Sequence, residues 1–155
     1  MAESAAAAAP SAAAPSAAAA RTAVPLVGLV LVSHSARLAE GVAELAGQLG
    51  GEDVPIEPAG GLPDGGLGTS SELIEQAVRA ADRGAGVVIL ADLGSAVLTV
   101  KLLIDDADLN QPRTVLLADA PLVEGAVSAA VAAASGASAE AVLAAAEEAR
   151  DFHKL

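Results

Sequence analysis

Three short, uninterrupted apolar runs restrict what this chain can fold into more than any other feature. They occupy residues 26–32, 87–91 and 115–118 and are rich in Val and Leu. Runs of this length are typical of strands buried on both faces, because a strand with one wet face would alternate apolar and polar residues. We therefore expect a sheet that is covered by helices on both sides.

Segments with a helical period separate these runs. Within residues 37–49, the large apolar side chains recur on one stripe: Leu38, Val42, Leu45 and Leu49. Further helices are expected from a cap at Thr69 or Ser70 through 81, over 96–106, from Pro121 to about 135, and from a cap at Ser138 through 146. Strands and helices thus alternate along the chain.

A fourth strand is expected over residues 54–58, which carry two prolines. Proline has no N–H to donate to a neighbouring strand, so this segment belongs at an edge of the sheet. Alternating strands and helices specify a parallel sheet, and right-handed crossovers leave few topologies. We predict an α/β fold: a flavodoxin-like, doubly wound, mostly parallel sheet with strand order 2-1-3-4 and helices on both faces.

The first 23 residues differ in composition from the rest of the chain. They consist mostly of Ala, Pro and Ser, and they lack the early positive charge and the Leu-rich stretch of a signal peptide. We expect residues 1–23 to be a disordered tail and residues 24–155 to form one domain. No apolar run approaches the roughly 18 residues of a transmembrane helix.

Charge and cysteine content narrow the possible functions. The formal net charge of −12 disfavours binding to nucleic acid or to anionic membranes, and it suits a partner with a basic face. The absence of cysteine excludes disulfides, a thiol nucleophile and a thiolate metal site. It is consistent with a reducing cytoplasm.

The predicted topology brings three polar segments to one crevice. Doubly wound sheets bind ligands beyond the carboxyl ends of the strands where the strand order reverses, here between the first and third strands. The first strand is followed by residues 33–35 (Ser-His-Ser), the third by residues 92–95 (Asp-Leu-Gly-Ser), and the edge strand by the glycine-rich segment 60–69. We expect these segments to form the functional site.

His34 is the residue of this crevice that points most clearly to a chemistry. A lone histidine does not make a zinc site, and neither flanking serine lies in a G-x-S-x-G nucleophile elbow. Attack on a phosphoryl group needs a neutral ring, a group that fixes its tautomer, and donors around the phosphate, which a helix N-terminus can supply. We interpret His34 as a phosphoryl-accepting nucleophile that needs no metal and no cofactor.

Supporting roles follow from the residues around His34. Asp92 is predicted to accept a hydrogen bond from one ring nitrogen and to leave the other free to attack, although an acid here is also a common helix cap. Thr69 is equally interpretable as a cap. The residues expected to bind or support the phosphate are Ser33, Ser35, Gly60, Gly61, Gly68, Thr69, Gly94 and Ser95.

In this order, the motifs resemble a known family. The sequence is similar to the mannose-type enzyme IIA domain of the phosphotransferase system (PTS), and more closely to the phosphotransferase subunits of PTS-dependent dihydroxyacetone kinases (DhaM). The resemblance covers about residues 24–149. It rests on LVSHS at 31–35, LAEG at 38–41, GG at 60–61, LGT at 67–69, DLGSA at 92–96 and APLVEG at 120–125.

The resemblance implies a function. His34 matches the phosphorylated histidine and Asp92 the acid that hydrogen-bonds it. The donor would be the phosphocarrier HPr, and the acceptor would be ADP on the nucleotide-binding subunit of dihydroxyacetone kinase, so that the chain acts as a cytoplasmic phosphoenolpyruvate–glycerone phosphotransferase. A homodimer is implied as well. Some relatives carry fused carrier domains; because this sequence ends at Leu155, we expect a separate HPr to deliver the phosphate.

Other functions stay open. A sugar-specific mannose-family component is the nearest, although such proteins usually carry Gly-Gly-Ser-Pro after the acid, where this chain has Gly-Ser-Ala at 94–96. A non-catalytic interaction domain is another. Flavin binding is disfavoured in a chain with one Phe and no Trp or Tyr. A receiver domain is disfavoured because Ser33 and His34, rather than two acids for Mg²⁺, end the first strand.

Overall fold

A four-stranded parallel sheet forms the centre of the molecule. The structure is a computed structural model, and it describes residues 24–106, 109 and 113–155. The strands are β1 (Gly28–Ser33), β2 (Ile56–Gly60), β3 (Val87–Ala91) and β4 (Val115–Leu117), in the order β2-β1-β3-β4 with every pairing parallel. The predicted α/β class and the 2-1-3-4 order are confirmed, with the proline-containing strand at an edge.

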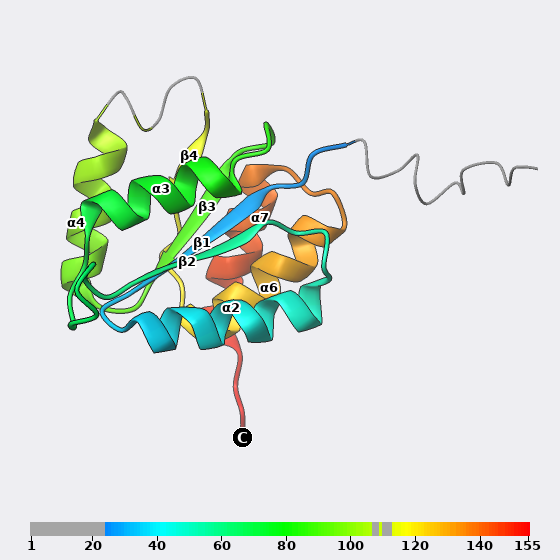
Figure 1. Cartoon of the computed structure of the whole chain (residues 1–155). Helices are drawn as coiled ribbons and strands as arrows, with labels where there is room; N and C mark the ends of the chain where they lie inside the picture. Colours follow the sequence, from blue (N-terminus) through cyan, green and yellow to red (C-terminus); the bar gives the residue numbers. More distant parts are fainter. Residues whose placement is uncertain (1–23, 107–108, 110–112) are drawn as a thin grey trace, which may run out of the picture.

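Helices cover both faces of this sheet. On one face lie α2 (Ala36–Gly50), α6 (Leu122–Ala134) and α7 (Ala139–Glu148), which the short 3₁₀ turn η1 (Ala149–Asp151) extends. On the other lie α3 (Ser71–Ala81) and α4 (Gly94–Asp105). Figure 1 shows the sheet between these two layers.

Alternate residues of the central strands pack against the two helix layers. On β1, Leu29 and Leu31 pack towards α2, α6 and α7, whereas Val30 and Val32 pack towards α3 and α4. All four side chains are fully buried. The continuous apolar run predicted as a strand thus has neighbours on both sides, as expected for a strand inside a doubly wound sheet.

The helix α2 turns a different face to the core from the one that the sequence predicted. Its buried residues are Ala39, Val42 and Ala46, whereas Leu38, Leu45 and Leu49 are each at least 43% exposed. The reason is close packing: small side chains on α2 let it lie tightly against the alanine-rich α6. The prediction followed the size of the apolar side chains; it was right for Val42 and wrong for the three leucines.

The edge strand β2 begins and ends two residues later than predicted. It pairs with β1 from Leu29↔Ile56 to Ser33↔Gly60, so Gly60 ends the strand instead of opening the loop. A side chain at Gly60 would place its Cβ 2.5 Å from the carbonyl oxygen of Ser35. Glycine is therefore required where this strand passes the start of α2.

Two further expectations from the sequence concerned the N-terminal tail and membrane-spanning helices. The predicted tail, residues 1–23, lies outside the described residues. Among the helices of the described part, none combines the length and the hydropathy that crossing a bilayer demands.

Candidate functional site

The central strand β1 positions His34. The strand lies between β2 and β3, and all six of its residues are buried. His34 is the next residue, so it leaves the sheet at the carboxyl edge, with its side chain 25% exposed. Ser35 then caps α2 by accepting a hydrogen bond from the N–H of Leu38 at 3.3 Å. The imidazole thus projects from a fixed junction between a buried strand and a helix.

The strand register brings Asp92 beside His34. Val32 on β1 pairs with Ala91 on β3, so the residues that follow leave the sheet side by side. Asp92 Oδ1 lies 2.9 Å from His34 Nδ1, and Oδ2 accepts a hydrogen bond from the backbone N–H of His34 at 2.9 Å. The contact that the sequence predicted between Asp92 and one ring nitrogen is therefore present, with a backbone bond beside it.

Two further donors complete the environment of Asp92. The buried hydroxyl of Ser33 donates to Oδ2 at 2.9 Å, and the N–H of Leu93 donates to Oδ1 at 2.7 Å. Burial alone would raise the pKa of the Asp92 carboxyl, but the hydrogen bonds from His34, Ser33 and Leu93 together outweigh burial and lower this pKa below its ordinary value. Asp92 is thus a carboxylate at neutral pH and can only accept hydrogen bonds.

The charge of Asp92 determines which ring nitrogen of His34 is open. Because the carboxylate has no proton to give, the hydrogen shared with Asp92 belongs to Nδ1 of His34. In a neutral ring, Nε2 then carries the lone pair. Ser95 Oγ lies 2.5 Å from Nε2, and with the ring in this tautomer the hydroxyl is the donor. A hydroxyl that can rotate away therefore covers the free nitrogen.

The helix α4 starts at the site without a side-chain cap. Its N-cap residue, Leu93, makes no side-chain capping bond, whereas serine hydroxyls cap α2, α3 and α7. The first-turn N–H groups of Gly94 and Ser95 lack intrahelical acceptors, and they lie at the positive end of the helix dipole. Such N–H groups suit an anion placed next to Nε2.

The glycine-rich segment supports the backbone of the site. Gly68 N–H donates to the carbonyl of His34 at 2.9 Å, and Gly61 N–H donates to that of Ser33 at 3.0 Å. Both glycines have positive φ, 148° and 69° respectively, which other residues rarely adopt. With Gly60 explained by its approach to Ser35, these three glycines have structural reasons for their presence that do not involve the imidazole.

Thr69 contacts the start of α4 through Thr99 and does not touch the His34 ring in the hydrogen bonds described. Its hydroxyl lies 3.3 Å from that of Thr99, which donates to the carbonyl of Ser95 at 3.1 Å. Ser70, and not Thr69, caps α3. Sequence reasoning did not single out Thr99, although it follows Ser95 by four residues on one helix and so shares its face. The two threonines brace the first turns of α4 against the loop.

A cleft of about 460 Å³ opens beside Asp92 at the carboxyl ends of β3 and β4. Lys101 is exposed and lines this cleft together with Val97 and Asp119. No three His, Asp or Glu side chains gather to hold a metal ion within residues 24–106, 109 and 113–155.

Comparison with known sequences identifies relatives over the folded part of the chain. A family model named EIIA-man, the PTS system fructose IIA component, matches residues 28–143. The phosphoryl donor subunit DhaM of PEP-dependent dihydroxyacetone kinase 2 from Listeria innocua is 37% identical over 120 residues, which are 76% of this chain and 94% of that protein. The DhaM subunit of Escherichia coli K12 is 38% identical over 121 residues, but the match covers only 26% of its length.

Solved structures agree on the fold. The crystal structure of the protein EF1359, whose function is described as unknown, has a TM-score of 0.68 and 36% identity, and the match covers 79% of this chain and 93% of that one. A sigma-54 interaction domain protein from Enterococcus faecalis has a TM-score of 0.61 at 14% identity, which shows the shared fold alone.

The family match extends from the first residue of β1 into α7, so it includes His34, Asp92 and the helices that start beside them. The resemblance that the motifs indicated is thereby confirmed. The chain therefore belongs to the EIIA-man family of PTS IIA components and is similar to the phosphoryl donor subunits called DhaM.

Proposed function

We propose that this chain is a phosphohistidine relay. It accepts a phosphoryl group from HPr on Nε2 of His34 and passes it to ADP bound on the nucleotide-binding subunit of dihydroxyacetone kinase. One observation carries the proposal: an imidazole whose Nδ1 is held by a carboxylate while Nε2 faces a hydroxyl at the start of a helix. The similarity to DhaM phosphoryl donor subunits supports the choice of acceptor.

Loading requires no proton transfer. The lone pair of His34 Nε2 forms a bond to phosphorus while the P–N bond of the phosphorylated carrier breaks, and that electron pair returns to the carrier's nitrogen. Nδ1 keeps its hydrogen throughout, so the His34 ring gains positive charge. The Asp92 carboxylate, 2.9 Å from Nδ1, stabilises this charge.

Unloading reverses these events on a different acceptor. A terminal phosphate oxygen of ADP bonds to phosphorus as the bond from phosphorus to Nε2 breaks, and the electron pair returns to Nε2. The products are ATP and a neutral His34 with its hydrogen still on Nδ1. Asp92 thus holds one tautomer through both half-reactions, which is the role that the sequence predicted for it.

The residues at the start of α4 receive the phosphoryl group. Ser95 must turn its hydroxyl away from Nε2 before attack, and it can then donate to a phosphoryl oxygen. The N–H groups of Gly94 and Ser95 add donors that are already in place. Ser33 acts through Asp92, and Ser35, Thr69 and the three glycines hold the backbone on which His34 and α4 rest.

The proposal also covers the cellular location and the oligomeric state of the chain. HPr and ADP are cytoplasmic reactants, so we place the chain in the cytoplasm. The family resemblance implies a homodimer, which light scattering on the purified chain tests directly. A monomer mass throughout the working concentration range would contradict this part of the proposal.

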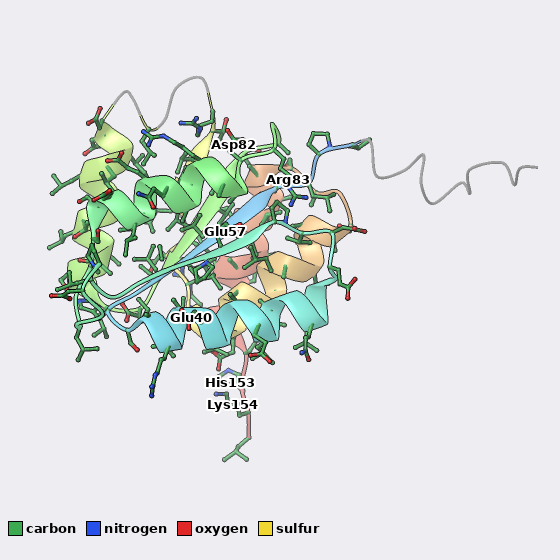
Figure 2. The ribbon with its side chains drawn as sticks, in the orientation of Figure 1. Glu40, Glu57, Asp82, Arg83, His153 and Lys154 are labelled. Atoms are coloured by element: carbon green, nitrogen blue, oxygen red, sulfur yellow. The ribbon has the colours of Figure 1, made fainter. Side chains whose placement is uncertain are left out.

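The test of the relay uses the two histidines of the chain. Incubation with enzyme I, HPr and labelled phosphoenolpyruvate should label the chain with acid-labile, base-stable phosphate. His34→Ala should abolish labelling and keep the fold, because the ring lines a surface crevice. His153→Ala is the matched control, since His153 lies on the exposed C-terminal segment that Figure 2 shows, and it should label normally.

The acceptor is tested in the second half-reaction. Addition of the nucleotide-binding kinase subunit with ADP should remove the label and produce ATP. Label that persists with this subunit but moves to a mannose-type sugar permease component would favour the sugar-specific function instead. Label on the His34→Ala variant would show that the nucleophile is elsewhere.

A further inference from the structure

The cations of this acidic chain divide into paired and unpaired ones. Among the described residues, ion pairs hold Arg79, Arg113, Arg150 and Lys154. The same part of the chain offers no ion-pair partner to Arg37, Arg83 or Lys101. In a chain with 20 acidic residues, an arginine without a partner keeps its charge available for another molecule.

Arg37 is distinguished by its position. It is the second residue of α2, three residues after His34, and its side chain is exposed. A cation in the first turn of a helix meets the positive end of the helix dipole, so it does not stabilise the helix that carries it. The stability of α2 therefore gives no reason for an arginine here.

The other helices show the arrangement that stability favours. An acid occupies the first turn of α3, α6 and α7, namely Glu72, Glu124 and Glu140. The first turns of α2 and α4 have none, and these are the two helices that begin beside His34. Apart from Asp92, which holds Nδ1, no carboxylate stands in the first turns of α2 and α4 to repel a phosphoryl group on Nε2, and α2 adds a positive charge.

We propose that the Arg37 guanidinium binds oxygens of the phosphoryl group and of the incoming acceptor phosphate while His34 is unloaded. This inference rests on the proposed relay. Phosphohistidine and ADP are both anionic and repel each other as they approach. The side chains that contact the His34 ring are the neutral Ser95 and the anionic Asp92, so neither offsets this repulsion.

The chemistry of the guanidinium suits this role. It stays charged, and its fork of N–H donors can bind two phosphate oxygens at once. As the acceptor oxygen bonds to phosphorus and the bond to Nε2 breaks, negative charge spreads over the phosphoryl oxygens. Arg37 stabilises that charge by hydrogen bonding and transfers no proton.

The test measures unloading separately from loading. Phosphorylated wild-type and Arg37→Gln chains are mixed with saturating ADP-loaded kinase subunit and sampled by rapid quench. We expect the maximal rate constant for loss of label to fall about a hundredfold in Arg37→Gln, the lower end of the loss that follows removal of one donor to transition-state charge. Arg37→Lys should recover part of the rate, because it keeps the charge and loses the fork.

Arg83→Gln is the matched control. Arg83 is also an exposed arginine without an ion pair, but it lies in the turn between α3 and β3, at the amino ends of the parallel strands, whereas His34 follows the carboxyl end of β1. Figure 2 shows Arg83 next to Asp82, far from Glu40 on α2. The charge change is the same, so Arg83→Gln should unload at the wild-type rate.

The outcomes are distinct. The thermal midpoint of Arg37→Gln should equal or exceed that of the wild type, so slow unloading cannot come from unfolding. Wild-type unloading by Arg37→Gln, or equal slowing by Arg83→Gln, would overturn the assignment of Arg37 and leave the relay in place. A wild-type chain that takes no label at all would overturn both.

Discussion

Asp92 connects more of the site than any other side chain described above. Its two oxygens accept hydrogen bonds from the ring and backbone of His34, from Ser33 and from Leu93. These bonds orient the imidazole and select the tautomer in which Nε2 is the free nitrogen. Residue-level predictions therefore concentrate on Asp92.

Asp92→Asn should slow phosphoryl transfer without abolishing it. The amide keeps the shape of the side chain, but it has no charge to stabilise the ring, and its NH₂ group can favour the wrong tautomer. We expect the loading rate from HPr to fall at least roughly tenfold to a hundredfold, the loss seen when a group that orients a metal-bound imidazole is removed. The rate is measured by quenched labelling. A wild-type rate would show that Asp92 serves only as a structural cap at the end of β3.

The same carboxylate should make stability depend on pH. Hydrogen bonding lowers the pKa of Asp92 below the ordinary value of 3.8, so its contribution to stability is complete above that value and is lost as the pH falls through the lower, folded-state pKa. The difference in unfolding free energy between wild type and Asp92→Asn should thus shrink as the pH falls from about 5 towards 2. Urea titrations at several pH values measure it. A difference that stays constant would mean that Asp92 does not titrate differently in the two states.

At the scale of elements, two of the three glycines in α2, Gly41 and Gly50, have opposite surroundings. At Gly41 an added Cβ would meet nothing within 4 Å, whereas at Gly50 it would come 2.5 Å from the Cβ of Ala130 and 2.8 Å from its carbonyl carbon. Gly41 is therefore a helix position that tolerates a side chain. Gly50 lies against the backbone of α6 and leaves no room for a side chain.

Substitution of these glycines by alanine should change stability in opposite directions. Gly41→Ala should stabilise the fold by about 0.5–1 kcal/mol through helix propensity. Gly50→Ala should destabilise it by about 1–3 kcal/mol, because the backbone of Ala130 on α6 cannot move away cheaply. Denaturant titration of both variants measures the effect. Equal shifts in one direction would contradict the close contact between α2 and α6.

At the scale of the whole molecule, the two layers are built differently. The layer of α2, α6 and α7 packs through small residues, whereas α3 and α4 bring larger ones such as Ile74, Val78 and Val100 to the sheet. In a chain without Trp or Tyr, close approach of helices replaces large aromatic side chains as the source of packing. This arrangement leaves several large apolar side chains of α2 and α4 on the surface, including Leu45, Leu49, Leu98 and Leu102.

The fold could be predicted from the sequence because its signals are local. A strand buried on both faces must be apolar at every position, a proline-rich strand must lie at an edge, and serines before helices are caps. These rules placed β1, β3 and β4, the edge position of β2 and the cap Ser138, and they narrowed the cap of α3 to Thr69 or Ser70. They failed for the inner face of α2, because hydrophobicity alone does not show that alanine, and not leucine, faces a closely packed neighbour.

The sequence by itself determined the alternation of elements, the parallel order of the strands and the meeting of residues 33–35 with residues 92–95, because strand ends in a parallel sheet share one edge. Tertiary structure alone decided which nitrogen of His34 is free. That depends on the register of β1 against β3, which sets Asp92 against Nδ1, and on the start of α4, which sets Ser95 against Nε2. Distances of this kind arise between segments about 60 residues apart, which no local pattern in the sequence records.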